Sequence, residues 1–129
     1  MSRDTPSATI GKLRIAIDCH DPERLALFWG AVLGVEIDER LGNPPQYVDL
    51  APRPPDGLEV DFQRVPEPKV AKNRLHFDLD VDDVDAATAW IEELGGRRLP
   101  HNDYHEYGYS WRLMADPEGN EFCLIYGFE

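Results

Sequence analysis

The chain has 129 residues and a formal net charge of −12, a length that suits one domain or two half-domains sharing a core. The strong negative charge argues against nucleic acid or an anionic membrane as a partner, because such surfaces would repel the protein at long range. No apolar run approaches the roughly 18 residues of a membrane span, and residues 1–11 lack the apolar centre of a signal peptide. A cytoplasmic location is therefore expected.

The two cysteines are expected to be buried free thiols. Cys19 and Cys123 lie inside apolar, strand-like runs rather than in a CxxC motif or a dense cysteine framework. This placement disfavours structural disulfides and a thiolate zinc site. For Cys123, packing is a simpler interpretation than a nucleophilic role, because nothing in the sequence establishes contact with a base.

The first half of the chain predicts a strand, a helix and three further strands. Residues 13–19 have the apolar pattern of a strand. Asp21 suits the N-cap of a helix with Pro22 at its first position, and apolar residues recur at helical spacing until Gly34. Three short extended segments follow, separated by turn residues at 42–45 and 52–57. A polar linker with two prolines is expected at residues 66–73.

The second half predicts the same order of elements. Residues 75–81 form the expected strand, and Asp82 or Asp83 caps the helix that ends near residues 95–96. The residues expected to be buried on this helix are Ala87, Trp90, Ile91 and Leu94. Turn residues at 101–108 and 116–120 separate three more extended segments, and the first of these two stretches is interpreted as a loop between Pro100 and Gly108.

The two halves are related by an offset of 62 residues. This offset places the segment 55–62 over 117–124 without a gap, and it superposes Asp21 on Asp83. Gly34 falls on Gly96 and Tyr47 on Tyr109 by the same shift. The sequence therefore predicts two copies of one βαβββ module, at residues 12–65 and 74–129, after a flexible N-terminus at residues 1–11.

Three motifs give the repeat a family resemblance. They are the LxxFWxxxLG pattern at residues 25–34, the RLHFDL segment at 74–79, and DPEGNEFCL at 116–124. The chain thereby resembles the glyoxalase-like branch of the vicinal oxygen chelate superfamily, which includes glyoxalases, bleomycin-resistance proteins and dioxygenases. The resemblance implies an α+β fold in which two tandem βαβββ modules form an incomplete β-barrel around a small-molecule cleft. It also implies a homodimer.

Strand alternation predicts which side chains face that cleft. Leu75, Phe77, Leu79 and Val81 should pack beneath the second helix, which leaves His76, Asp78 and Asp80 on the opposite face. In the first half Leu13, Ile15 and Ile17 should face the helix, with Arg14 in the cleft. A face with this many charged groups is expected to be wet, internally paired or filled by a ligand, since unpaired buried charges are costly.

The resemblance also implies a ligand set for a divalent metal such as Zn, Ni, Mn or Fe. The family's metal positions fall on Arg14, Glu59, His76 and Glu121. A histidine and two carboxylates suit a metal, but Arg14 places a permanent positive charge where the cation would bind. This departure argues against glyoxalase I or extradiol dioxygenase activity. It leaves open a metal-free cleft, a structural ion network of Arg14 with the two glutamates, or a His76 without a catalytic role.

Two functions remain as alternatives. One is a lyase or isomerase acting on an oxygen-rich metabolite, with His76, Glu59 and Glu121 as metal ligands or acid/base groups. The other is a non-catalytic protein that sequesters a ligand or an antibiotic, in the manner of bleomycin-resistance proteins. In either case Arg14, Asp78, Tyr104, Tyr109 and Trp111 are candidate substrate-binding residues, the aromatic ones as a lip over the cleft.

Overall fold

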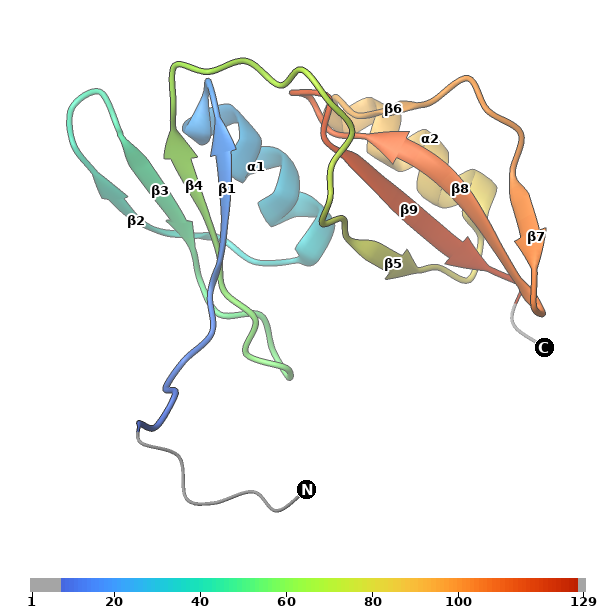
Figure 1. The fold of residues 1–129 in the computed structure, drawn as a ribbon, viewed down its shortest axis with the longest axis horizontal. Coiled ribbons are helices and arrows are strands. Elements are labelled where there is room, and N and C mark those ends of the chain that lie inside the picture. Colours follow the sequence, from blue (N-terminus) through green and yellow to red (C-terminus); the bar gives the residue numbers. More distant parts are fainter. Residues whose placement is uncertain (1–7, 128–129) are drawn as a thin grey trace.

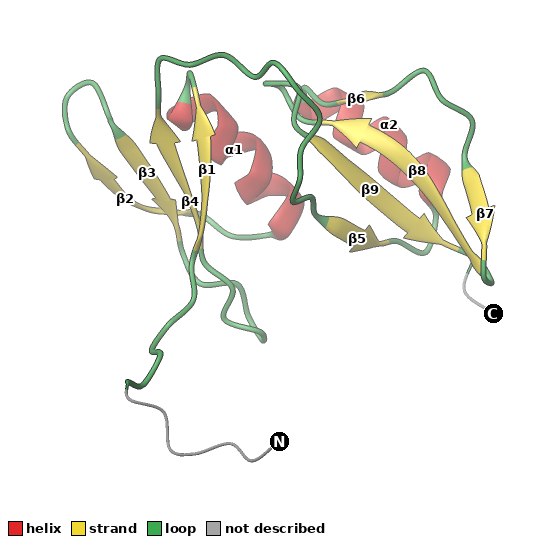
Figure 2. Cartoon of the chain, in the orientation of Figure 1, coloured by secondary structure: helices red, strands yellow, loops and turns green. Residues whose placement is uncertain are grey.

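The computed structural model describes residues 8–127 and has an α+β architecture with two open sheets, each covered by one helix (Figures 1 and 2). The flexible N-terminus predicted for residues 1–11 lies, for residues 1–7, outside the described residues. The elements of the first half are β1 (Ile15–Cys19), α1 (Pro22–Leu33), β2 (Ile37–Leu41), β3 (Tyr47–Leu50) and β4 (Val60–Arg64). Those of the second half are β5 (Asp78–Asp80), α2 (Val84–Leu94), β6 (Arg97–Arg98), β7 (Tyr104–Glu106), β8 (Tyr109–Ala115) and β9 (Glu121–Tyr126).

Both helices begin and end where capping residues predict. The Asp21 side chain accepts a hydrogen bond from the Arg24 N–H at 3.1 Å, and Pro22 occupies the first turn of α1. Asp83 plays the same part for α2 by accepting from the Ala86 N–H. The C-caps are Gly34 and Gly95, both in the left-handed conformation. The second cap therefore lies one residue earlier than the 62-residue offset predicts.

The strand register carries the sequence repeat into three dimensions. In the first sheet, of order β1-β4-β3-β2, Ala16 pairs with Asp61. In the second sheet, of order β5-β9-β8-β6, Asp78 pairs with Cys123, and both numbers are shifted by 62. The offset fails at β8, because Trp111 rather than Tyr109 occupies the register position of Tyr47.

The second half contains a strand that the sequence did not predict. Residues 101–108 were expected to form a loop, but Tyr104–Glu106 is the short strand β7, which pairs with the first residues of β8. The hairpin turns at Tyr107 and Gly108, both with positive φ. Tyr107 is an unfavourable residue for that conformation, so local sequence does not mark this position as a tight turn.

The two halves share one hydrophobic core. The ring of Trp29 on α1 lies 5.0 Å from that of Phe77 and 4.9 Å from that of Phe122, both in edge-to-face geometry. Core residues from the two halves form a single cluster, with Leu25 and Phe62 from the first half and Ile91 from the second. The α1 helix thus covers the first sheet and also contacts the second half, as Figure 1 shows.

The DPEGN segment forms a turn that joins the halves. The buried Asp116 accepts hydrogen bonds from the backbone N–H groups of Glu118 and Asn120 and, at 3.0 Å, from the indole N–H of Trp29. Glu118 in turn accepts from the N–H groups of His20 and Asp21, each at 2.7 Å. The motif therefore has a structural role, because it connects the second half to the N-terminal end of α1.

Several predicted burial positions are wrong. Trp90 is 45% exposed, because the buried side of α2 is centred on Thr88 and Ile91. Leu13 and Leu75 are 78% and 89% exposed. Each precedes the strand to which it was assigned and lies beyond the cover of the helix. Phe77, Leu79 and Val81, by contrast, pack against the core as alternation predicts. Within residues 8–127 neither helix is long and apolar enough to cross a membrane.

Candidate ligand-binding site

A cavity of about 910 Å³ lies on the face of the second sheet that points away from α2. Alternation along the strands creates this face, because Phe122 and Leu124 point into the core while Cys123 and Ile125 line the cavity. Its lining comes from β5, β7, β8, β9 and the segment before β5. The lining residues are Lys72, His76, Asp78, Asp80, Tyr104, Glu106, Tyr107, Tyr109, Trp111, Leu113, Cys123 and Ile125. We call this cavity the second-sheet pocket.

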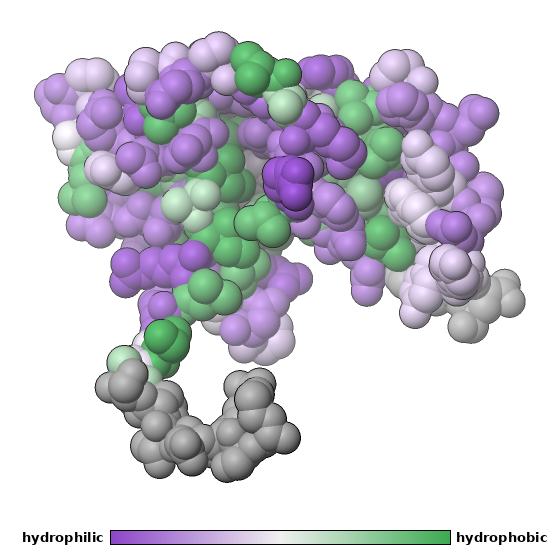
Figure 3. Space-filling model, viewed as in Figure 1, coloured by the Kyte–Doolittle hydropathy of each residue, from purple (hydrophilic) through white to green (hydrophobic). Residues whose placement is uncertain are grey.

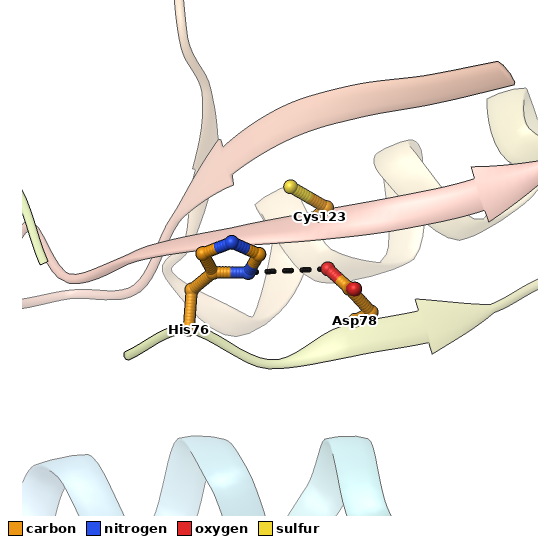
Figure 4. A group of neighbouring side chains, drawn as sticks. All are labelled: His76, Asp78 and Cys123. Atoms are coloured by element: carbon orange, nitrogen blue, oxygen red, sulfur yellow. Dashed lines mark ion pairs between the residues drawn. The ribbon is translucent and has the colours of Figure 1, made fainter. Parts of the chain in front are cut away.

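Three polar side chains form the floor of the second-sheet pocket. Asp78 on β5, Cys123 on β9 and His76 in the segment before β5 point toward one another (Figure 4). The Nδ1 atom of His76 lies 3.1 Å from Oδ1 of Asp78. Burial, followed by the nearby Asp78 carboxylate, raises the pKa of the Cys123 thiol to about 11. At neutral pH Cys123 is therefore a protonated thiol and a weak nucleophile.

Aromatic rings form the rim of the pocket. The rings of Tyr104 and Trp111 stack with centroids 5.3 Å apart and an interplanar angle of 13°. Tyr107 and Tyr109 follow in the same hairpin. A flat ring that enters the pocket therefore meets a pre-formed aromatic surface beside an acidic floor.

A buried arginine holds this rim in place. Arg112 lies on the opposite face of β8 and donates to both carboxylate oxygens of Asp103, the residue that precedes β7. It also donates to Thr88 on α2 at 2.9 Å, and the Tyr126 hydroxyl donates to Asp103 as well. The Arg112 hydrogen bond, together with that from Tyr126, lowers the pKa of the Asp103 carboxyl although burial opposes the shift. The rim hairpin is thereby fixed to the body of the second module.

The second-sheet pocket is acidic. Its lining carries three carboxylates, Asp78, Asp80 and Glu106, against one ammonium group, that of Lys72. The whole chain adds to this field with its formal charge of −12. A cationic ligand is therefore favoured over an anionic one.

The structure does not gather the four sequence-predicted ligand positions in one place. Glu59, directly before β4, forms ion pairs with Lys12 and, at 3.8 Å, with Arg14, which directly precedes β1. Glu121 accepts from the backbone N–H of Asn73 and lies 3.2 Å from the ammonium group of Lys69.

A second cavity, of about 670 Å³, does lie between the two halves. Both His76 and Glu121 line it, together with Asp18 of the first sheet. His76 thus borders both cavities, whereas Glu59 and Arg14 border neither.

These contacts decide how well the metal implied by the family resemblance fits. Lysine ammonium groups neutralise Glu59 and Glu121, and the described residues contain a single group of three close metal donors, which includes His76 but neither glutamate. The implied set of His76 with the two glutamates therefore does not fit a metal ion in this conformation.

Some lining residues were not among the predicted site residues. Cys123 was interpreted as a packing residue, although its alternation with Phe122 and Leu124 already placed it on the open face. Glu106 reaches the pocket because it alternates with Tyr104 along β7, a strand that was not predicted. Lys72 lies in the expected linker, where no periodic sequence pattern indicates which way a side chain points.

The fold is that of proteins built from two paired βαβββ modules. Comparison with known proteins identifies the family. Residues 14–125 match the family model described as a glyoxalase-like domain. The chain belongs to this family and, through it, to the vicinal oxygen chelate superfamily. No curated protein sequence matches the chain significantly.

Solved structures of the superfamily share this fold at low sequence identity. A glyoxalase/bleomycin resistance protein/dioxygenase family enzyme from Burkholderia phytofirmans has a TM-score of 0.69 at 18% identity, over 89% of this chain and 97% of that one. The genomically encoded fosfomycin resistance protein FosX from Listeria monocytogenes also has a TM-score of 0.69, at 16% identity over 93% and 95%. A glyoxalase family protein from Bacillus cereus matches with a TM-score of 0.66 at 14% identity, over 98% and 100%. At these identities the likeness concerns the fold alone.

Proposed function

We propose that this protein binds and sequesters a small cationic molecule that carries a planar ring, in the manner of antibiotic-sequestering members of its superfamily. The observation that supports this proposal is the combination of stacked Tyr104 and Trp111 with a net acidic lining in one open pocket. A ring stacks on the aromatic rim, and its positive charge is attracted by Asp80 and Glu106.

The ion-paired glutamates favour binding over catalysis. A general base must be free to accept a proton, yet Glu59 and Glu121 each face a lysine. The Cys123 thiol, with its pKa raised to about 11, is also a weak nucleophile at neutral pH. Two of the three predicted catalytic residues are therefore occupied by structural contacts.

A lyase or isomerase remains a second candidate because of one observation. The Nδ1 atom of His76 lies 3.1 Å from Oδ1 of Asp78, and this pairing orients the imidazole in the way that a general base requires. Under this alternative, His76→Gln abolishes the conversion of a metabolite that wild type consumes from a small-molecule cell extract, as followed by mass spectrometry. Under the sequestration proposal, wild type retains a component of the extract and releases it chemically unchanged on denaturation.

Calorimetric titration with two planar dyes tests the sequestration proposal. Ethidium supplies a cationic ring system, and fluorescein supplies an anionic one of similar size. We expect ethidium to bind the wild-type protein at least about tenfold more tightly than fluorescein, which corresponds to about 1.4 kcal/mol. Equal affinity for the two dyes, or tighter binding of fluorescein, contradicts the proposal.

The chain offers a matched pair of tryptophan variants for this titration. Trp111→Ala removes one ring of the rim stack and should weaken ethidium binding at least about tenfold. Trp90→Ala removes a half-exposed ring on α2, which does not line the pocket, and should leave the affinity unchanged. If both variants lose affinity equally, the dye does not bind at the aromatic rim.

We also propose a homodimer. The strands β1 and β5 are edge strands, and exposed leucines precede both of them. Figure 3 shows hydrophobic residues beside the junction of the two halves, and further ones over the second half, among hydrophilic residues. Unpaired edges and exposed apolar side chains are features that a second copy of the chain would cover.

A further inference from the structure

We propose that His76, Asp78 and Cys123 form a binding site for a soft divalent cation such as Zn²⁺ on the floor of the second-sheet pocket. This set differs from the one that the family resemblance implies, because it uses the second module alone and replaces both glutamates. The inference does not rest on the proposed function, since a metal ion can bind the floor whether or not a ring enters at the rim.

The backbone brings the three donors together. Asp78 and Cys123 are register partners on the neighbouring parallel strands β5 and β9, and the Cys123 N–H donates to the Phe77 carbonyl at 2.9 Å. His76 precedes Asp78 by two residues and therefore lies on the same side of the chain. Regular strand pairing sets the positions of Asp78 and Cys123, whereas His76 lies in the segment directly before β5.

The distances between the donor atoms suit a tetrahedral ion. One donor atom from each of the three side chains lies within 4.8 Å of the other two. Zinc bonds of about 2.0 to 2.3 Å place neighbouring donors roughly 3.3 to 3.7 Å apart in a tetrahedral complex. The His76 and Asp78 atoms already lie 3.1 Å apart, so small rotations of the side chains complete the geometry.

The chemistry of the donors indicates the class of metal. A thiolate and an imidazole select Zn²⁺ and similar soft or borderline ions over Mg²⁺ or Ca²⁺. On binding, Cys123 loses its thiol proton to solvent, and the thiolate and the Asp78 carboxylate together balance the charge of the ion. Lys72 also lines the cavity and opposes a cation, but Asp80 on the same lining offsets it.

The proposed site has a consequence for the ligand. Three protein donors leave a fourth coordination position, which opens toward the cavity rather than toward the core. A bound molecule can then place an oxygen or nitrogen donor on the ion while its ring stacks against Trp111 and Tyr104. Asp80 and Glu106 keep the surrounding pocket acidic, because the metal complex itself is neutral.

Titration of the intact protein with Co²⁺ under reducing conditions tests the proposal, because cobalt bound to a thiolate gives an intense near-ultraviolet charge-transfer band. We expect the wild-type protein to develop this band with one equivalent of Co²⁺ and to lose it when Zn²⁺ is added. Cys123→Ser should abolish the band. The matched control is Cys19→Ser, which replaces the other buried free cysteine, one that lies outside the pocket, and should retain the band in full.

A second variant distinguishes the loss of the metal site from a folding defect. Asp78→Asn alters a half-exposed side chain with little change in shape and should lower the affinity for Co²⁺ at least about tenfold, with an unchanged circular dichroism spectrum. The absence of a charge-transfer band in folded wild type would overturn the site, as would its persistence in Cys123→Ser or its loss in Cys19→Ser. Trp111→Ala should keep the cobalt band while losing ethidium, so failure of the metal site and failure of the proposed function are distinguishable.

Discussion

Trp29 and Trp90 illustrate how differently one residue type behaves on the two helices. Trp29 is buried among aromatic rings and donates its indole N–H to Asp116, whereas Trp90 is 45% exposed. Trp29→Ala should lower the free energy of unfolding by about 3 to 5 kcal/mol, because it opens a cavity and leaves one oxygen of Asp116 short of a donor. Trp90→Ala should cost less than about 1 kcal/mol. Urea unfolding of both variants measures the difference, and equal losses would contradict the assigned faces of α1 and α2.

The ion pair between Asp103 and Arg112 should make stability depend on pH. The pKa of Asp103 is lowered in the folded protein, so its contribution is present above the unfolded pKa of about 3.9 and is lost as the pH falls through the folded value. Asp103→Asn leaves Arg112 buried without its main partner and should cost about 3 kcal/mol at pH 7.

Urea unfolding of wild type and Asp103→Asn at pH 7 and at stepwise lower pH measures this dependence. The difference between the two proteins should shrink below about pH 4, as the wild-type carboxylate becomes protonated. The control is Asp56→Asn, which breaks the exposed pair with Arg53 and should change stability little at any pH. A difference for Asp103→Asn that is constant with pH would show that the effect is not the loss of the ion pair.

Two glycines that follow α1 and α2 are constrained differently, one by its backbone conformation and the other by close neighbouring atoms. A Cβ atom on Gly96 would lie 2.7 Å from Cγ2 of Ile91 and 3.0 Å from the carbonyl oxygen of Ala115. Gly34 has a φ of 73° but open space around it. Gly96→Ala should therefore cost about 2 to 3 kcal/mol by overpacking, while Gly34→Ala should cost about 1 kcal/mol from backbone strain alone. Thermal melts of both variants show which one loses more stability. A larger loss in Gly34→Ala than in Gly96→Ala would contradict the close packing described for the junction between α2 and β6.

Local signals in the sequence predicted the main elements. The caps Asp21, Asp83 and Gly34 act through contacts within a few residues, so their positions can be found from sequence alone. The pairing of β1 with β4 and that of β5 with β9 are related by the same shift of 62 residues as the internal repeat. The α+β fold of two modules was confirmed for the same reason.

Features that depend on tertiary context were not predicted. Trp90 borders the apolar stripe of α2, and only the position of the sheet decides that the stripe is centred on Ile91. The strand β7 forms because β8 offers it a partner, while its own sequence is polar and aromatic. The ion pairs of Glu59 and Glu121 involve lysines, and no sequence pattern indicates where the lysine side chains point. These contacts decide which candidate site residues lie together.

For the whole molecule, the homodimer is the outstanding prediction. Light scattering at micromolar concentration should give twice the 14.7 kDa mass of one chain. Leu75→Glu places a charge on the exposed leucine before β5 and should shift the protein toward the monomer. Leu27→Glu alters another exposed leucine, on α1, and serves as the control that should remain dimeric. A wild-type mass near that of one chain would contradict the dimer.

The three tryptophans of the chain report separately on where the ligand binds. Trp111 lines the second-sheet pocket, Trp29 lies in the shared core, and Trp90 lies on α2. Their indole N–H signals can be followed together in ¹H–¹⁵N NMR spectra during titration with ethidium. We predict that the Trp111 signal shifts progressively to saturation while those of Trp29 and Trp90 stay in place. A shift of the Trp90 signal with Trp111 unmoved would contradict it, because the ligand would then bind outside the pocket.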